Sequence, residues 1–183
     1  MNTSKKENFL ANLLILVSVF GRLIPHPANV TPMGAVSLVG GAKLSQFWKW
    51  SIPFIALIMS DFLLGVFRQV TPWSYVTPFI YLSFAINIFL GSRIGTEHRY
   101  RNLTLFSILG SAQFFVLSNF GVWMQGFLYP KTLTGLMECY TMAIPFLRNS
   151  LLGDLCWSLA LFTVLSRVQS WVSTKEKIQI ASL

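Results

Sequence analysis

Apolar residues gather in six stretches along the chain, separated by short segments that contain prolines, glycines and charged residues. A transmembrane helix needs about 20 predominantly apolar residues. The pattern therefore predicts an all-α integral membrane protein, with residues 1–183 forming a single domain of six transmembrane helices. The helices are expected at about 9–24, 33–48, 50–68, 75–95, 103–126 and 147–171.

The segment 128–146 departs from this pattern. Four residues make it too polar for a spanning helix: Lys131, Glu138, Cys139 and Tyr140. Irregular backbone at membrane depth is tolerated only where protein or a water-filled cavity covers it. We therefore expect a short interfacial or re-entrant segment before the last helix.

Composition and charge place the chain in a bilayer and orient it. Apolar residues make up 54% of the chain and charged residues 11%, against about 25% charged residues in soluble domains. With the N-terminus in the cytoplasm, the outer side carries four of the 14 Lys and Arg residues, which are Arg22, Arg68, Lys131 and Arg148. This bias follows the positive-inside rule. We expect a multi-pass protein of the bacterial cytoplasmic (inner) membrane with both termini cytoplasmic, whose net charge of +8 reports orientation and not binding to nucleic acid.

A proline-rich segment, RLIPHPANVTPMGA at residues 22–35, joins the first two predicted helices. Proline fixes φ and lacks a backbone donor, so the segment follows a rigid, non-helical path. It holds His26 and Asn29 at a membrane boundary, as half of a binding site would. Because the chain has only 2 histidines, a multi-histidine metal site is excluded and no intrinsic cofactor is expected. His26 is then either a hydrogen-bonded loop anchor or an axial ligand to a metal already held in a cofactor.

The remaining polar side chains of the predicted helices fall at one depth, on the outer side. Charged groups in a membrane must face the bundle interior or a water-filled cavity. In a structural interpretation, Asp61 pairs with Arg22 or Arg68. Asp154 pairs likewise with Arg148, and both pairs lock helices together. In a functional interpretation these groups line a substrate pocket that opens outward. The candidate substrate-binding residues are His26, Asn29, Asp61, Tyr75, Asn119, Trp123, Arg148, Asn149 and Asp154.

Motifs of common catalytic and nucleotide-binding sites are absent from the sequence. It contains no C-x-x-C, H-E-x-x-H, Walker A or G-x-S-x-G pattern. An intramembrane enzyme would need His26 as general base with Asp61 or Asp154 as its orienting acid, and no activated nucleophile accompanies them. We do not expect an enzyme, and any ATP hydrolysis must come from partner subunits.

The proline-rich segment, followed by Gly40-Gly41, resembles the opening of the substrate-binding (S) components of energy-coupling-factor vitamin transporters. The similarity continues along most of the chain, in Ser60-Asp61, Gly65, Pro72-Trp73-Ser74-Tyr75, Ser118-Asn119-Phe120, Trp123, Tyr129-Pro130, Cys139-Tyr140, Ala143-Ile144-Pro145-Phe146, Asn149 and Gly153-Asp154. The resemblance implies six helices, cytoplasmic termini and an outward-facing pocket. It also implies three partners: a small-molecule substrate, the lipid bilayer and an energising transporter module.

Within that family the chain is similar to the solitary cobalamin type, which has a histidine in the first outer loop and an aspartate in helix three. The resemblance implies that His26 and Asp61, with Tyr75 nearby, line a corrinoid pocket. One position departs from the family pattern: a cysteine thiolate that binds cobalt is expected shortly after the aspartate, where this chain has Ser74 and Tyr75. The departure weakens cobalamin as the substrate and argues against thiolate-driven removal of the upper cobalt ligand.

The sequence is therefore compatible with three functions. The first is a membrane-embedded binding and uptake protein for a vitamin-like small molecule, with cobalamin or another corrinoid as the first choice. The second is an accessory or structural inner-membrane protein without transport activity. The third and least favoured is an intramembrane enzyme that uses His26.

Overall fold

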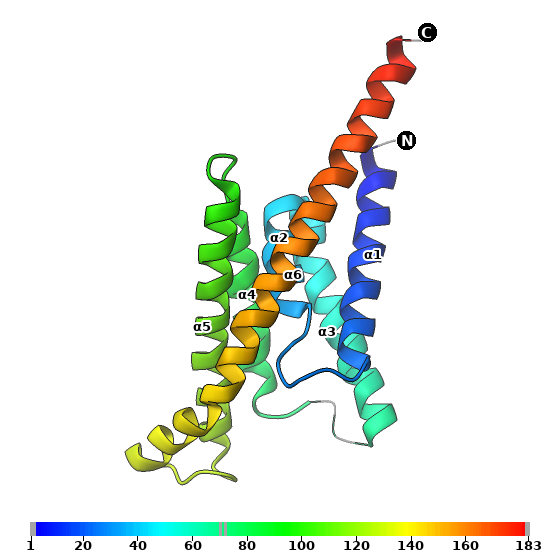
Figure 1. The fold of residues 1–183 in the computed structure, drawn as a ribbon. Coiled ribbons are helices and arrows are strands. Elements are labelled where there is room, and N and C mark those ends of the chain that lie inside the picture. The colour runs from blue at the N-terminus through cyan, green and yellow to red at the C-terminus, as the bar shows by residue number, and fades with distance from the viewer. Residues whose placement is uncertain (1–2, 70, 72, 182–183) are drawn as a thin grey trace.

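A computed structural model describes the backbone of residues 3–69, 71 and 73–181, and the side chains of residues 8–67, 69, 71 and 73–170. All regular structure in this part of the chain is helical, in six helices (Figure 1). They are α1 (Thr3–Leu23), α2 (Met33–Lys43), α3 (Gln46–Arg68), α4 (Thr77–Ser92), α5 (Arg99–Gln125) and α6 (Leu133–Ala181). The prediction of an all-α protein is confirmed.

The helices run alternately up and down, so the start of α1 and the end of α6 lie at the same end of the bundle (Figure 1). The short helix α2 stands in the centre and contacts each of the other five. Its residues from Met33 to Gly41 are all buried. Because α2 has 11 residues, it is about 16 Å long, roughly half of the 30 Å hydrocarbon core.

Close backbone packing between α2 and α4 explains the glycines of the central helix. A Cβ atom at Gly41 would collide with the carbonyl oxygen of Ile88, and one at Gly91 would collide with that of Leu38. Small residues let membrane helices approach closely, because the bilayer offers no hydrophobic force to drive them together. Glycine at these two positions therefore brings α4 directly against α2.

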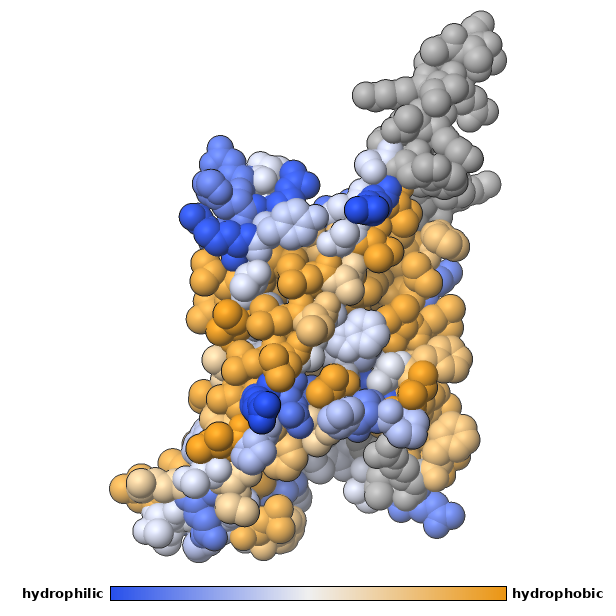
Figure 2. Space-filling view, in the orientation of Figure 1, coloured by the Kyte–Doolittle hydropathy of each residue, from blue (hydrophilic) through white to orange (hydrophobic). Residues whose placement is uncertain are grey.

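Three helices are long and apolar enough to cross a membrane: the stretches Gln46–Phe67, Arg99–Gln125 and Leu133–Ser170. The apolar parts of α1 and α4 are shorter. Between the hydrophilic residues at the upper left and a band of polar residues across the lower third, the face shown in Figure 2 is predominantly apolar. Large apolar side chains such as Phe9, Phe62 and Leu109 are exposed. The helices thus indicate a membrane protein whose outer faces suit contact with lipid.

The boundary between the second and third helices differs from the prediction. The second helix was expected to run to residue 48, but α2 ends at Lys43 and α3 already begins at Gln46. Leu44 and Ser45 take extended backbone conformations, with ψ of 157° and 164°. This two-residue corner reverses the chain, and it leaves the second helix too short to cross the bilayer alone.

The region before the last helix is helical and continuous with it. Helix α6 begins at Leu133 and includes Pro145, and its first turns bend away from the direction of the rest of the helix (Figure 1). The interfacial or re-entrant position of this segment stays a prediction. Two of the polar groups that argued against a spanning helix bond to α5. The Tyr140 hydroxyl donates to the carbonyl oxygen of Val116 at 2.7 Å, and Cys139 Sγ lies 3.4 Å from that of Asn119. These bonds satisfy polar side chains that lipid could not.

Candidate functional site

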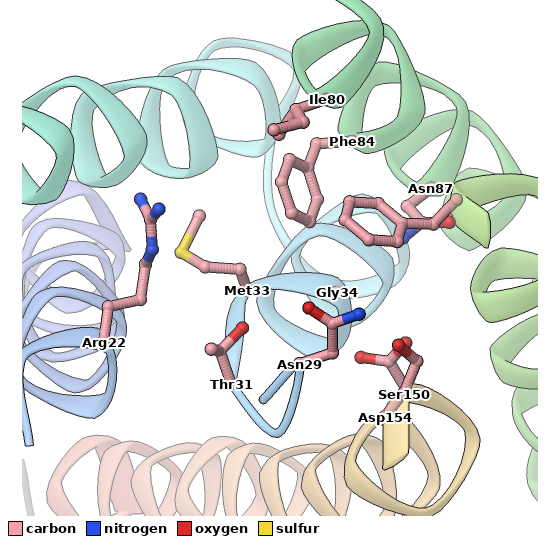
Figure 3. A pocket seen from close by; sticks show the side chains of 11 residues that line it. Arg22, Asn29, Thr31, Met33, Gly34, Ile80, Phe84, Asn87, Ser150 and Asp154 are labelled. Carbon is pink, nitrogen blue, oxygen red and sulfur yellow. The ribbon is translucent and has the colours of Figure 1, made fainter. Parts of the chain in front are cut away.

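A cavity of about 170 Å³ opens where the proline-rich segment enters α2 (Figure 3). Side chains from α1, α2, α4, α5 and α6 surround it, together with the segment itself. Its lining residues are Arg22, Asn29, Thr31, Met33, Gly34, Ile80, Phe84, Asn87, Phe114, Ser150 and Asp154. Arg22 and Asp154 lie on opposite sides, with Thr31, Met33 and Asn29 between them (Figure 3).

On the α1 side, Arg22 is already neutralised by a carboxylate. Its Nη1 lies 2.7 Å from Oδ1 of Asp61 on α3, and the two side chains are 20% and 13% exposed. The guanidinium also donates to the hydroxyl of Ser60, and the Tyr81 hydroxyl donates to Asp61 Oδ2 at 3.2 Å. The predicted pairing of Asp61 with Arg22 is confirmed, while the side chain of the alternative partner Arg68 lies outside the described residues.

On the α6 side, Asp154 has no cationic partner among the described side chains. Ser111 donates to its Oδ2 at 2.7 Å. The carboxylate also packs against the backbone of α2 so closely that a Cβ atom at Gly34 would overlap it. Asp154 thus presents a partly buried, unpaired carboxyl group to the cavity.

The predicted pair between Asp154 and Arg148 is wrong. The two residues are six positions apart on one helix, which places them about 120° apart around its axis. Asp154 faces the bundle, whereas Arg148 is exposed and lies beside Ile144, Leu147 and Leu151 on the outer surface. Similar depth in the membrane does not bring the two side chains together.

One hydrogen bond holds the proline-rich segment against α6: Asn149 Nδ2 donates to the carbonyl oxygen of Ala28 at 3.1 Å. Within the segment, the backbone N–H of Val30 donates to the carbonyl oxygen of Pro27 at 3.0 Å. Asn29 takes a left-handed conformation, with φ of 64°, which asparagine tolerates better than most residues. The rigid path expected from the prolines is therefore built, and it brings Asn29 to the rim of the cavity.

His26 lies outside the cavity although it belongs to the same segment. Its side chain is exposed, and Nδ1 lies 2.8 Å from the carbonyl oxygen of Pro27. It therefore has the local hydrogen bond of the loop-anchor interpretation, made to the next residue only. Among the described residues, no group of three or more His, Cys, Asp or Glu is arranged to hold a metal ion.

Three further candidates also lie away from the cavity. Tyr75 is 77% exposed. Asn119 uses its amide to bond the carbonyl oxygen of Phe115 within its own helix, at 2.8 Å. Trp123 Nε1 donates to the carbonyl oxygen of Pro130 at 3.1 Å, which fastens the turn that follows α5.

Of the nine predicted site residues, the structure brings two into the cavity lining, Asn29 and Asp154. Asp61 adjoins the cavity through Arg22, and Asn149 supports the segment that forms its rim. His26, Tyr75, Asn119, Trp123 and Arg148 do not line the cavity.

Sequence reasoning missed the amide cluster next to the cavity. Gln113 Nε2 on α5 donates to Asn87 Oδ1 at 3.0 Å and to the carbonyl oxygen of Ser83 at 2.9 Å. Gln113 Oε1 is buried without a protein partner among the described residues. The signal was present in the sequence, because an amide inside an apolar helix is costly and marks a functional or packing site.

These features define a helical membrane protein with a polar cavity at the end of a buried central helix. The chain belongs to DUF6580, a family of unknown function, which matches residues 2–176. No curated protein and no solved structure matches the chain.

Proposed function

We propose that the protein is a membrane-embedded binding and uptake protein for a small, polar, vitamin-like molecule that enters the cavity at the start of α2. The proposal rests on one observation: Asp154 lines the cavity and has no cationic partner among the described side chains, whereas Arg22 across the same cavity is neutralised by Asp61. Burying an unpaired carboxylate inside a membrane bundle costs free energy, so such a group usually marks a functional site.

The charges around the cavity favour a ligand with an ammonium or similar cationic group. Such a group would pair with Asp154 and remove the cost of its burial. Asn29, Thr31 and Ser150 provide amide and hydroxyl groups for the polar remainder of the ligand. Since Arg22 already has Asp61, a strongly anionic ligand finds no free cation, and a cationic or zwitterionic molecule fits better.

The volume of the cavity favours a ligand smaller than a corrinoid. Its 170 Å³ lies below the roughly 300–1,000 Å³ typical of sites for drug-sized molecules. Cobalamin, the first choice from the sequence resemblance, would require α2 or the proline-rich segment to move outward. The exposed position of His26 gives no support to cobalt ligation inside the cavity.

For the topology, we propose that all six helices lie within a bacterial cytoplasmic membrane, with both termini in the cytoplasm. The proline-rich segment then descends into the bundle and supplies the length that α2 lacks. The unequal distribution of Lys and Arg supports this orientation. Because the sequence has no nucleotide-binding motif, an energising transporter module would provide the energy for uptake.

An accessory or structural role is the second candidate, and the Arg22 cluster favours it. Arg22, Ser60, Asp61 and Tyr81 satisfy one another and join α1, α3 and α4 without a ligand. This arrangement explains one side of the cavity as helix packing. It leaves Asp154 unexplained, which is why binding is the preferred proposal.

Thermal unfolding of the detergent-purified protein against a panel of small molecules tests the proposal. The panel contains amines, zwitterions, anions, vitamins and their precursors, including cobalamin and cobinamide. A ligand at 100 times its Kd adds about 2.7 kcal/mol to the free energy of unfolding. We expect cationic or zwitterionic members to raise the Tm of the wild type and not that of Asp154→Asn.

The exposed Arg148→Gln substitution is the control and should keep the shift. Failure of every compound to raise the Tm of the wild type would favour the accessory role.

A further inference from the structure

A second, smaller cavity lies at the opposite end of α2, where that helix ends beside the α4–α5 turn and α6. Its volume is about 100 Å³, and its lining residues are Ala42, Lys43, Ile94, Gly95, Thr96, Arg99 and Phe162. None of these residues lines the cavity at the start of α2. The two sites therefore share the central helix and no side chain.

Two cations from distant parts of the chain meet in this second cavity. Lys43 comes from the last turn of α2 and Arg99 from the first turn of α5. Both line the same space, and their charges repel one another. Neither forms an ion pair with a carboxylate among the described residues. The cavity therefore holds two positive charges and no paired carboxylate among the described residues, which favours the binding of an anion.

The Lys43 side chain is partly buried and held in place. Its Nζ lies 4.3 Å from the centre of the Phe162 ring on α6, within the range of a cation–π contact. Arg99 Nε donates to the carbonyl oxygen of Thr96 at 3.4 Å, a long bond that leaves most guanidinium donors available. A Cβ atom at Gly95 would meet no other atom within 4 Å, so the turn leaves open space on its side of the cavity.

We infer that this second cavity binds a phosphate group through Lys43 and Arg99. Arginine offers paired donors that match phosphate oxygens, and lysine adds a compact positive charge. Hydrophilic residues gather over the α4–α5 turn and the start of α5, at the end of the bundle where lipid headgroups would lie (Figure 2). The phosphate can come from an anionic lipid or from solution, and the chemistry of recognition is the same.

Lipid retention by the full-length protein tests the inference. The purified protein is mixed in detergent with equal amounts of phosphatidylglycerol and phosphatidylcholine, and bound lipids are counted by native mass spectrometry. We expect at least fivefold preference for phosphatidylglycerol in the wild type. The double substitution Lys43→Met and Arg99→Gln should abolish the preference.

Lys49→Met with Arg101→Gln removes the same two residue types near the same end but outside the cavity, and it should keep the preference. Equal losses in both double variants would overturn the inference, because they would show attraction to diffuse charge. If Lys43→Met prevents folding, Arg99→Gln alone is used, since Arg99 is exposed.

A second arm identifies the source of the phosphate. Inorganic phosphate is titrated against the wild type, and both the Tm and the bound phosphatidylglycerol are measured. Displacement of the lipid, with a higher Tm, assigns the site to free phosphate, whereas unchanged lipid retention assigns it to a lipid headgroup. The absence of both a lipid preference and a Tm shift would overturn the inference.

Discussion

The two charged sides of the main cavity are built differently. On one side, Arg22 and Asp61 form an ion pair across α1 and α3, with bonds from Arg22 to Ser60 and from Tyr81 to Asp61. On the other, Asp154 has one hydroxyl donor and no cation among the described residues. The comparison separates charges that stabilise the bundle from a charge that is available to a ligand.

The largest expected effect comes from breaking the ion pair between Arg22 and Asp61. Arg22→Ala leaves Asp61 as an unpaired, mostly buried carboxylate, and breaking a buried pair in this way costs about 3–5 kcal/mol. We expect a strongly lowered Tm in detergent for Arg22→Ala. Restoring a neutral pairing with Arg22→Met and Asp61→Leu together should recover most of the loss. An unchanged Tm in Arg22→Ala would show that the pair does not hold the helices together.

Asp154→Asn should have the opposite profile. It removes a costly unpaired charge and keeps the shape of the side chain, so the free energy of unfolding without ligand should not fall by more than about 1 kcal/mol. Asp61→Asn, the matched substitution in the ion pair with Arg22, should lower the Tm clearly. Thermal unfolding of the two variants side by side measures the difference. Equal losses would remove the distinction between the two sides.

Gly34→Ala sharpens the comparison from the α2 side. The added methyl group would overlap the Asp154 carboxylate and force it to move, so we expect ligand affinity to fall about tenfold, or ~1.4 kcal/mol. Gly40→Ala is the control on the same helix, because its Cβ atom would meet only Leu44 Cδ1 at an ordinary 3.5 Å. Binding measurements on both variants check the prediction, and equal affinities would contradict it.

His26→Ala should have the smallest effect. The side chain is exposed and contacts the neighbouring carbonyl group of Pro27, so the free energy of unfolding should change by less than about 0.5 kcal/mol. Ligand affinity should stay the same. A loss of binding in this variant would instead favour the corrinoid mode implied by the sequence resemblance.

The parts of the fold that the sequence predicted are those that depend on local pattern. Six apolar stretches correspond to six helices, and the prolines before α2 do produce a non-helical path. The pair of Arg22 with Asp61 was predictable because both ends of the pair lie at the same depth on adjacent helices. Asn29 was predicted as a site residue because the proline-rich segment holds it at a membrane boundary, and Asp154 because it shares the outer depth of the other polar helix residues.

The parts that were missed depend on tertiary contacts. The sequence did not predict that residues 133–146 are helical and continuous with the last helix, and that α5 provides acceptors for Cys139 and Tyr140 there. Asp154 and Arg148 share a depth, but helix geometry points them in different directions. Asn87 and Gln113 each look like an isolated amide in an apolar helix, and only the packing of α4 against α5 joins them.

The most direct test of ligand binding by Asp154 is the Kd of the ligand with the largest Tm shift, measured for wild type, Asp154→Asn and Arg148→Gln. Removing one partner of a buried charge pair costs about 2–5 kcal/mol, which corresponds to roughly 30-fold or more in affinity. We expect this loss in Asp154→Asn and unchanged affinity in Arg148→Gln. Equal affinity in Asp154→Asn and wild type would contradict the claim that Asp154 binds the ligand.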